Sequence, residues 1–239
     1  MAERFWEVDF ARGIAIVMML LSNFLFDLYF FAGCSSCYAG FWFYFARATA
    51  FLFILLAGVS LTLSYSRLES KAVFKKYMKR GLRIFSWGIL ITIITWALIG
   101  EGFVLFGILH LIGVSVILGH LLLRFRFLNL VLGLTLIIAS FFLQNISGHA
   151  WLLWTGLAPY GFFSIDYTPL IPWFGVFLIG IFLGNSIYPK GKQRLPKNTN
   201  PIVKGLSLLG RRSLLIYFAH QPIFIVLLFM WLNIPVSVL

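Results

Sequence analysis

Apolar residues fill most of the chain in seven long runs, which are separated by shorter polar segments. The runs lie at residues 12–32, 40–65, 83–100, 103–123, 127–144, 169–188 and 212–233. A run of about 17 to 25 apolar residues can cross the hydrocarbon layer of a membrane as a helix. The pattern therefore predicts an all-α protein, a polytopic membrane helical bundle of about seven transmembrane helices that forms a single domain over residues 1–239.

Composition supports a membrane protein and excludes a soluble one. Hydrophobic residues make up 61% of the 239 residues and charged residues only 11%, and the mean hydropathy is +0.97. Such values are typical of multi-pass proteins, so we expect the chain in the cell membrane. The first run contains Asn23 and Asp27 and ends without a clear cleavage site, which favours a retained span over a signal peptide.

Positive charges mark alternate gaps between the runs. All but one of the 19 Lys and Arg residues lie at the N-terminal start or in the gaps after the second, fourth and sixth runs. They are Arg4, Arg12, Arg67, Lys71, Lys75, Lys76, Lys79, Arg80, Arg83, Arg124, Arg126, Lys190, Lys192, Arg194, Lys197, Lys204, Arg211 and Arg212. Positive residues in short loops stay cytoplasmic, which predicts a cytoplasmic N-terminus and an outside C-terminus. We attribute the net charge of +12 to membrane topology and to attraction by the anionic headgroups of the lipid bilayer. Binding of nucleic acid is not expected, because no loop has room for a nucleic-acid-binding module.

Arg47 is the exception, because it lies inside the run at 40–65. A guanidinium at membrane depth is costly unless it has a partner in the protein interior. On the first run, Arg12 and Asn23 lie within about 20° of each other around the helix, and Asn23 and Asp27 are one turn apart. Asp27 should reach a depth similar to that of Arg47, which predicts an ion pair that serves either packing or a functional site.

Two histidines lie within the runs. His110 is expected at the depth of the predicted ion pair, where an imidazole could act as a general base, the alternative being a hydrogen-bonded packing residue. His220 lies in the last run with Tyr217 and Gln221 on its helical face. We interpret it either as a bridge between helices or as a substrate-binding residue.

Several blocks then follow one another in a characteristic order. The chain opens with Asp-Phe-Ala-Arg-Gly-Ile-Ala at 9–15 and Met-Met-Leu-Leu-Ser-Asn at 18–23, and further blocks lie at 53–60, 79–83, 107–113, 172–175 and 213–222. Together they resemble the heparan-alpha-glucosaminide N-acetyltransferase catalytic family and its small prokaryotic relatives, within the superfamily of transmembrane acyltransferases. Each block is weak alone, and the specificity lies in their order over nearly the whole chain.

The resemblance implies that an acetyl group moves from cytoplasmic acetyl-CoA, the donor substrate, to an amino or hydroxyl group of a sugar-containing acceptor outside, with no metal. Asn23 would polarise the thioester carbonyl. His110, oriented by Asp27 or by another hydrogen-bond acceptor nearby, would take the proton of the attacking group, either directly or after forming an acetyl-imidazole. The residues expected to bind the donor are Arg12, Arg80 and Arg83. Those expected to bind substrate are Arg47, Trp173, Tyr217, His220 and Gln221.

The chain also departs from this family. The heparan-acetylating enzyme carries a catalytic His just after the first span, whereas residues 28–42 contain none. We therefore hypothesise that His110 takes over the chemistry, the alternative being a chain that has lost acetylation. Because larger relatives have more spans, a second copy in a homodimer could complete the acceptor pocket.

Other features leave alternatives open. Cys34 and Cys37 form a CxxC pair that could remain as free thiols, close a short disulfide, or serve a metal or redox role. The aromatic segment 145–168 is either an interfacial belt or a lid over the acceptor. A proton-coupled transporter and a non-catalytic membrane scaffold are the competing functions, and the lack of an inverted repeat argues against the transporter.

Overall fold

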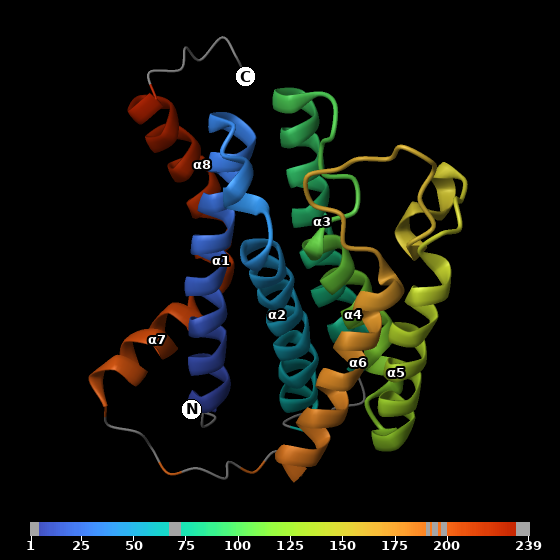
Figure 1. Ribbon diagram of the computed structural model, residues 1–239. Helices are drawn as coiled ribbons and strands as arrows, with labels where there is room; N and C mark the ends of the chain where they lie inside the picture. The colour runs from blue at the N-terminus through green and yellow to red at the C-terminus, as the bar shows by residue number, and fades with distance from the viewer. Residues whose placement is uncertain (1–4, 67–72, 190–191, 193–195, 197–199, 233–239) are drawn as a thin grey trace. The chain divides into compact units, whose positions relative to one another are not determined.

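The computed structural model describes residues 5–66, 73–189, 192, 196 and 200–232, and in these it contains helices and no strand. The elements are α1 (Trp6–Ala32), η1 (Ser35–Tyr38), α2 (Phe41–Tyr65), α3 (Val73–Ile99), α4 (Ile108–Leu122), α5 (Arg126–Leu143), η2 (Ala150–Thr155), α6 (Leu170–Ile187), α7 (Pro201–Arg211) and α8 (Ser213–Leu232) (Figure 1). The basic residues that lie outside the described part are Arg4, Arg67, Lys71, Lys190, Arg194 and Lys197.

Six helices, α1, α2, α3, α5, α6 and α8, are long and apolar enough to cross a membrane, which confirms a polytopic helical membrane protein. The expectation of a span at 103–123 is wrong, because the helix there, α4, has only 15 residues. Its length of about 22 Å is too short for a hydrocarbon layer of about 30 Å. The start of that run is not helical, because Gly102 and Phe106 direct their carbonyls to the N–H groups of Ile165 and Thr168. The orientation of the termini stays a prediction.

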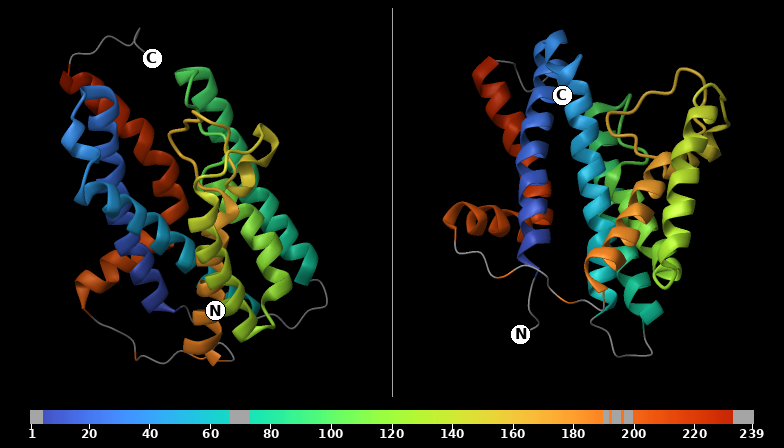
Figure 2. Two further views of the ribbon diagram at one scale, coloured as in Figure 1. Left: turned by 45° about the vertical axis from the view of Figure 1, so that its right-hand side comes forward. Right: turned by 60° about the horizontal axis from the view of Figure 1, so that its bottom comes forward.

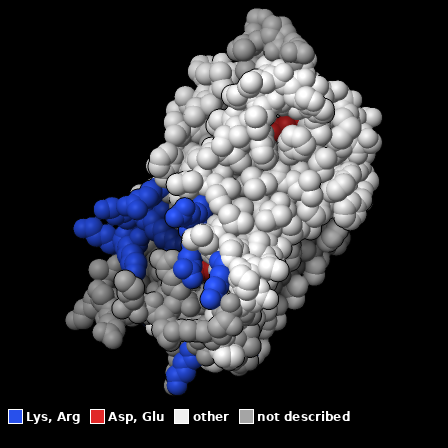
Figure 3. Space-filling model, turned by 90° about the vertical axis from the view of Figure 1, so that its left-hand side faces the viewer, with Lys and Arg blue, Asp and Glu red and all other residues white. Residues whose placement is uncertain are grey.

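The chain divides into two compact units, residues 1–53 with 193–239 and residues 54–192, and the boundary falls within α2. The expected single domain stays a prediction. On the face drawn in Figure 3, Lys and Arg side chains lie toward the lower left, and most of the upper part carries no charge. Large apolar side chains such as Trp96, Phe142 and Met230 are more than half exposed, as expected for helices that face lipid.

In the first unit, α7 crosses the N-terminal half of α1, and α8 runs beside α1 (Figures 1 and 2). Two glycines allow α7 to approach closely. A Cβ at Gly13 would lie 2.0 Å from the carbonyl oxygen of Leu206, and one at Gly210 would lie 1.9 Å from that of Asp9. Any larger residue at either position would therefore push α7 away from α1.

In the second unit, α3 packs on α4 and α5 packs on α6. Glycines again bring the backbones together, because a Cβ at Gly81 would lie 2.6 Å from the oxygen of Gly113, and one at Gly175 equally close to that of Gly133. Small residues of this kind are common where membrane helices touch. Helix α3 begins at Val73, well before the run predicted at 83–100, so Lys75, Lys76, Lys79 and Arg80 are part of the same helix.

Candidate functional site

Two polar pairs connect α1 and α8 within the first unit. The side-chain amide nitrogen Nδ2 of Asn23 lies 2.7 Å from Nε2 of His220, and Nε2 of Gln221 donates to Oδ1 of Asp27 at 2.6 Å. Asn23 and Asp27 are one turn apart on α1, while His220 and Gln221 are consecutive on α8, so the pairs are neighbours. The structure thus brings together four of the residues selected from the sequence.

Helix α8 itself fixes the ring of His220. Its Nδ1 lies 2.8 Å from the carbonyl oxygen of Tyr217 and 3.2 Å from that of Ile216. A carbonyl oxygen only accepts, so Nδ1 carries the ring proton and Nε2 accepts from the amide of Asn23. The imidazole is buried, and in this tautomer its lone pair lies on Nε2, the atom that faces Asn23 of α1.

Asp27 is buried more completely, with 1% of its surface exposed. One carboxylate oxygen is bound by Gln221, whereas Oδ2 is buried without a hydrogen-bond partner in the described part of the chain. A buried polar atom without a partner is costly. This oxygen can therefore accept a further donor, one helical turn from the pair formed by Asn23 and His220.

Arg47 does not pair with Asp27, so the predicted ion pair is wrong. Within the described residues no salt bridge joins the two side chains; Arg47 is exposed, with its guanidinium carbon 5.3 Å from the ring centre of Phe43. The physical reason is its place within two turns of the start of α2. From there a long side chain can extend its charged end to the polar interface, and no buried partner is needed.

Arg12 belongs to a different cluster, where α7 crosses α1. Its Nη1 lies 3.1 Å from Oδ1 of Asp9 and 3.4 Å from the carbonyl oxygen of Gly210. Nε of Arg211 lies 3.3 Å from Oδ2 of the same Asp9. These contacts favour a role in fastening α7 to α1, and the expected role of Arg12 in donor binding stays a prediction.

His110 lies in the second unit and is 2% exposed. Its Nδ1 accepts the backbone N–H of Gly107 at 3.2 Å, which caps the start of α4. Nε2 must then carry the ring proton, and it faces the hydroxyl of Thr92 at 3.4 Å. The ring packs edge-on to Phe85 and stacks on Phe106. This environment favours a capping and packing residue over a general base.

The other predicted site residues lie on α3, α6 and α8. Trp173 is buried on α6, Arg80 is half-buried and Arg83 exposed on α3, and Tyr217 is half-buried on α8. The first three belong to the second unit with His110. The predicted grouping of these residues with Asn23 and Asp27 stays a prediction.

Asp166 connects two segments of the second unit and was not singled out by the sequence pattern. Its Oδ2 accepts the backbone N–H of Ile108 at 3.0 Å, and its Oδ1 accepts the hydroxyl of Thr168 at 2.7 Å. The carboxylate therefore ties the loop before α6 to the start of α4. The feature of the sequence that could have pointed to Asp166 is its position as the one acidic residue in the aromatic segment 145–168.

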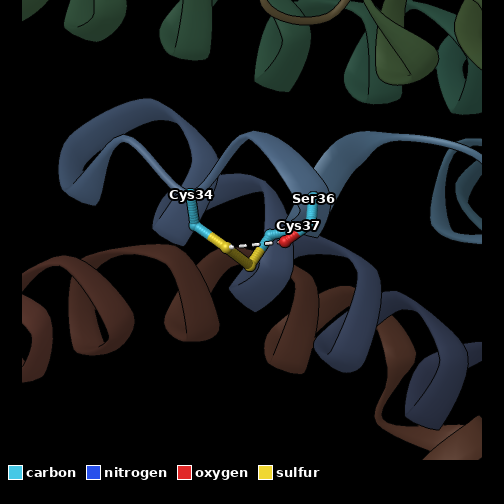
Figure 4. The surroundings of a disulfide bond; sticks show 3 residues. All are labelled: Cys34, Ser36 and Cys37. Atoms are coloured by element: carbon cyan, nitrogen blue, oxygen red, sulfur yellow. Dashed lines mark hydrogen bonds between the residues drawn. A yellow bond between two sulfur atoms is a disulfide. The ribbon is translucent and has the colours of Figure 1, made fainter.

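Cys34 and Cys37 form a disulfide, which decides against free thiols (Figure 4). In the described part of the chain, no three His, Cys, Asp or Glu side chains are grouped as metal ligands would be.

Comparison with known proteins supports the resemblance found in the sequence blocks. The family described as heparan-alpha-glucosaminide N-acetyltransferase, catalytic, matches residues 4–222. No curated protein and no solved structure matches the chain. The match extends from the start of α1 into α8 and thus includes both members of each polar pair. The described residues include six helices long and apolar enough to cross a membrane. With this match, the chain belongs to the heparan-alpha-glucosaminide N-acetyltransferase catalytic family, a membrane acetyltransferase type.

Proposed function

We propose that the protein transfers an acetyl group from cytoplasmic acetyl-CoA to an amino or hydroxyl group of a sugar-containing acceptor at the outer side. Membership of the family supports a membrane acetyltransferase. The observation that carries the assignment of the site is the contact of 2.7 Å between the amide of Asn23 and Nε2 of His220. It holds a hydrogen-bond donor and a neutral base together on two apolar helices.

Acetyl transfer needs both groups. When the amide of Asn23 turns from His220 to the thioester, its N–H stabilises the negative charge that develops on the carbonyl oxygen. Nε2 of His220 is then free to take the proton of the attacking amine or hydroxyl. The new C–N or C–O bond forms as the C–S bond breaks. The proton passes from the imidazole to the departing thiolate, which leaves as CoA thiol.

We assign the base to His220 in place of His110. The partner of Nε2 in His220 is a side chain that can rotate away. In His110 the lone pair of Nδ1 accepts the backbone N–H of Gly107, so its use as a base would disrupt the start of α4. Gln221 and Asp27 keep α1 and α8 in register beside the reactive pair.

Donor and acceptor binding are proposed for further residues. Arg80 and Arg83 on α3 supply guanidinium groups, which suit the phosphates of acetyl-CoA. The residues proposed for the acceptor side are Arg47, Trp173 and Tyr217.

The test uses purified protein in liposomes, labelled acetyl-CoA and glucosamine. His220→Ala should lower turnover at least about 100-fold, the usual contribution of a general base, while donor affinity is retained. Asn23→Ala should cost about 100-fold to 1,000-fold. His110→Ala should lower stability but keep the turnover of the fraction that folds. A wild-type protein that neither binds nor consumes acetyl-CoA would refute the proposal, and full activity of His220→Ala would remove only this base.

A further inference from the structure

The disulfide between Cys34 and Cys37 lies in a turn that other contacts already hold. Gly33 ends α1 in the left-handed region with φ 69°, and the N–H of Cys34 donates to the carbonyl of Leu28 at 3.2 Å. The N–H of Cys37 donates to the carbonyl of Cys34 at 3.0 Å. Both cysteines are therefore placed by backbone hydrogen bonds that do not depend on the bond between their sulfurs.

Aromatic packing fixes the other end of the turn. Tyr38, directly after Cys37, packs against Phe26 and Tyr29 of α1 with ring centres 5.0 Å and 5.5 Å away. A crosslink that closes so short a loop removes less entropy from the unfolded chain than one that closes a long loop, because this entropy grows with loop length. Stabilisation is thus a weak explanation for this disulfide.

The surroundings of the sulfurs suit exchange chemistry. Gly33, Ser35 and Ser36 are exposed, and both cysteines are half-buried. Oγ of Ser36 lies 3.6 Å from Sγ of Cys34 (Figure 4). A disulfide sulfur carries no proton, so the hydroxyl is the donor. The same hydroxyl would stabilise a thiolate on Cys34, and a stabilised thiolate is the better leaving group.

We propose that the pair formed by Cys34 and Cys37 is a reversible thiol–disulfide exchange site for a dithiol protein. A thiolate of that protein attacks Sγ of Cys37, the bond between the two cysteines breaks, and Cys34 leaves as a thiolate. The second thiolate of the partner attacks the mixed disulfide and releases Cys37. Two electrons pass to this chain, whose thiolates take up two protons, and the partner becomes a disulfide.

The equilibrium test uses the full chain in liposomes, with graded ratios of reduced and oxidised dithiothreitol. Thiols are trapped with a maleimide and counted by mass spectrometry, and circular dichroism follows the helices. We expect complete and reversible interconversion with unchanged helix content. A disulfide that resists excess dithiothreitol in the folded protein, or helix loss on reduction, would overturn the proposal.

Two variants with a single cysteine test the leaving group. In Cys37→Ser the remaining Cys34 should react with iodoacetamide several-fold faster at neutral pH than Cys37 does in Cys34→Ser. Addition of Ser36→Ala should abolish that difference, whereas Ser35→Ala, in the same turn, should leave it intact. Equal rates in the two parent variants would overturn the assignment of Cys34 as leaving group.

Discussion

Nδ2 of Asn23 lies 2.7 Å from Nε2 of His220, although the two residues are 197 positions apart in the chain. The contact between Gln221 and Asp27 repeats this connection one turn further along α1. The first and last described helices therefore build the candidate site together, and neither carries it alone.

Replacement of Asn23 and His220 should reveal energetic coupling between them. Hydrogen bonds between membrane helices contribute about 0.6 kcal/mol on average and about 1.7 kcal/mol at most, so we expect a coupling energy in that range. The free energy of unfolding in detergent, measured for both alanine variants and the double variant, gives this value. The control is the combination of Asn23→Ala with Lys204→Gln on α7, whose changes in unfolding free energy should add. If the changes caused by Asn23→Ala and His220→Ala also add, the contact is contradicted.

The pair of Asp27 and Gln221 should show an order of stabilities. Gln221→Leu leaves the buried carboxyl group of Asp27 without its donor and should be the most costly, at about 3 kcal/mol or more. Asp27→Leu leaves only a neutral amide unpaired and should cost about 1–3 kcal/mol, while the double variant should regain most of the loss. Unfolding in detergent measures all three, and a double variant as unstable as the sum of the singles would refute this account.

Glycines at the crossing of α1 and α7 should resist substitution. Gly13→Ala and Gly210→Ala place a Cβ against backbone oxygens at 2.0 Å and 1.9 Å, so α7 must shift at a cost of about 1–3 kcal/mol. Gly205→Ala on the same helix meets nothing within 4 Å and should stabilise by up to about 1 kcal/mol. The melting temperature and the rate of tryptic cleavage after Lys204 are measured for all three variants. Equal behaviour would show that α7 does not pack on α1.

The loop before α6 should respond to alkaline pH through Tyr167, whose hydroxyl donates to the carbonyl of Leu153 at 2.7 Å. Burial raises the pKa of Tyr167 from 10.0 to about 12. In this interval the folded protein keeps a proton that the unfolded chain loses, so the stabilisation is present below about pH 10 and disappears as the pH rises to about 12. The difference in unfolding free energy between wild type and Tyr167→Phe should shrink over that interval. A difference independent of pH would contradict the buried phenol.

Hydropathy located most helices well because burial in lipid demands long apolar runs, but it failed at three places. The first is the run at 103–123, whose start is not helical, so that α4 is too short to span. Helix α3 begins earlier than its apolar run because Lys and Arg favour helix almost as well as apolar residues do. Helix α7 was not predicted, because its 11 residues have no long apolar run and its helical state depends on packing against α1.

The sequence by itself determined the class of the protein, the places of the spanning helices and the polar residues that interrupt them, including Asn23, Asp27 and His220. Only the tertiary structure decided which of these residues meet. Helical register gives the direction of a side chain about its own axis, but the helix that faces it depends on packing between distant segments. For this reason depth alone paired Asp27 with Arg47, whereas α8 in fact supplies its partner, Gln221.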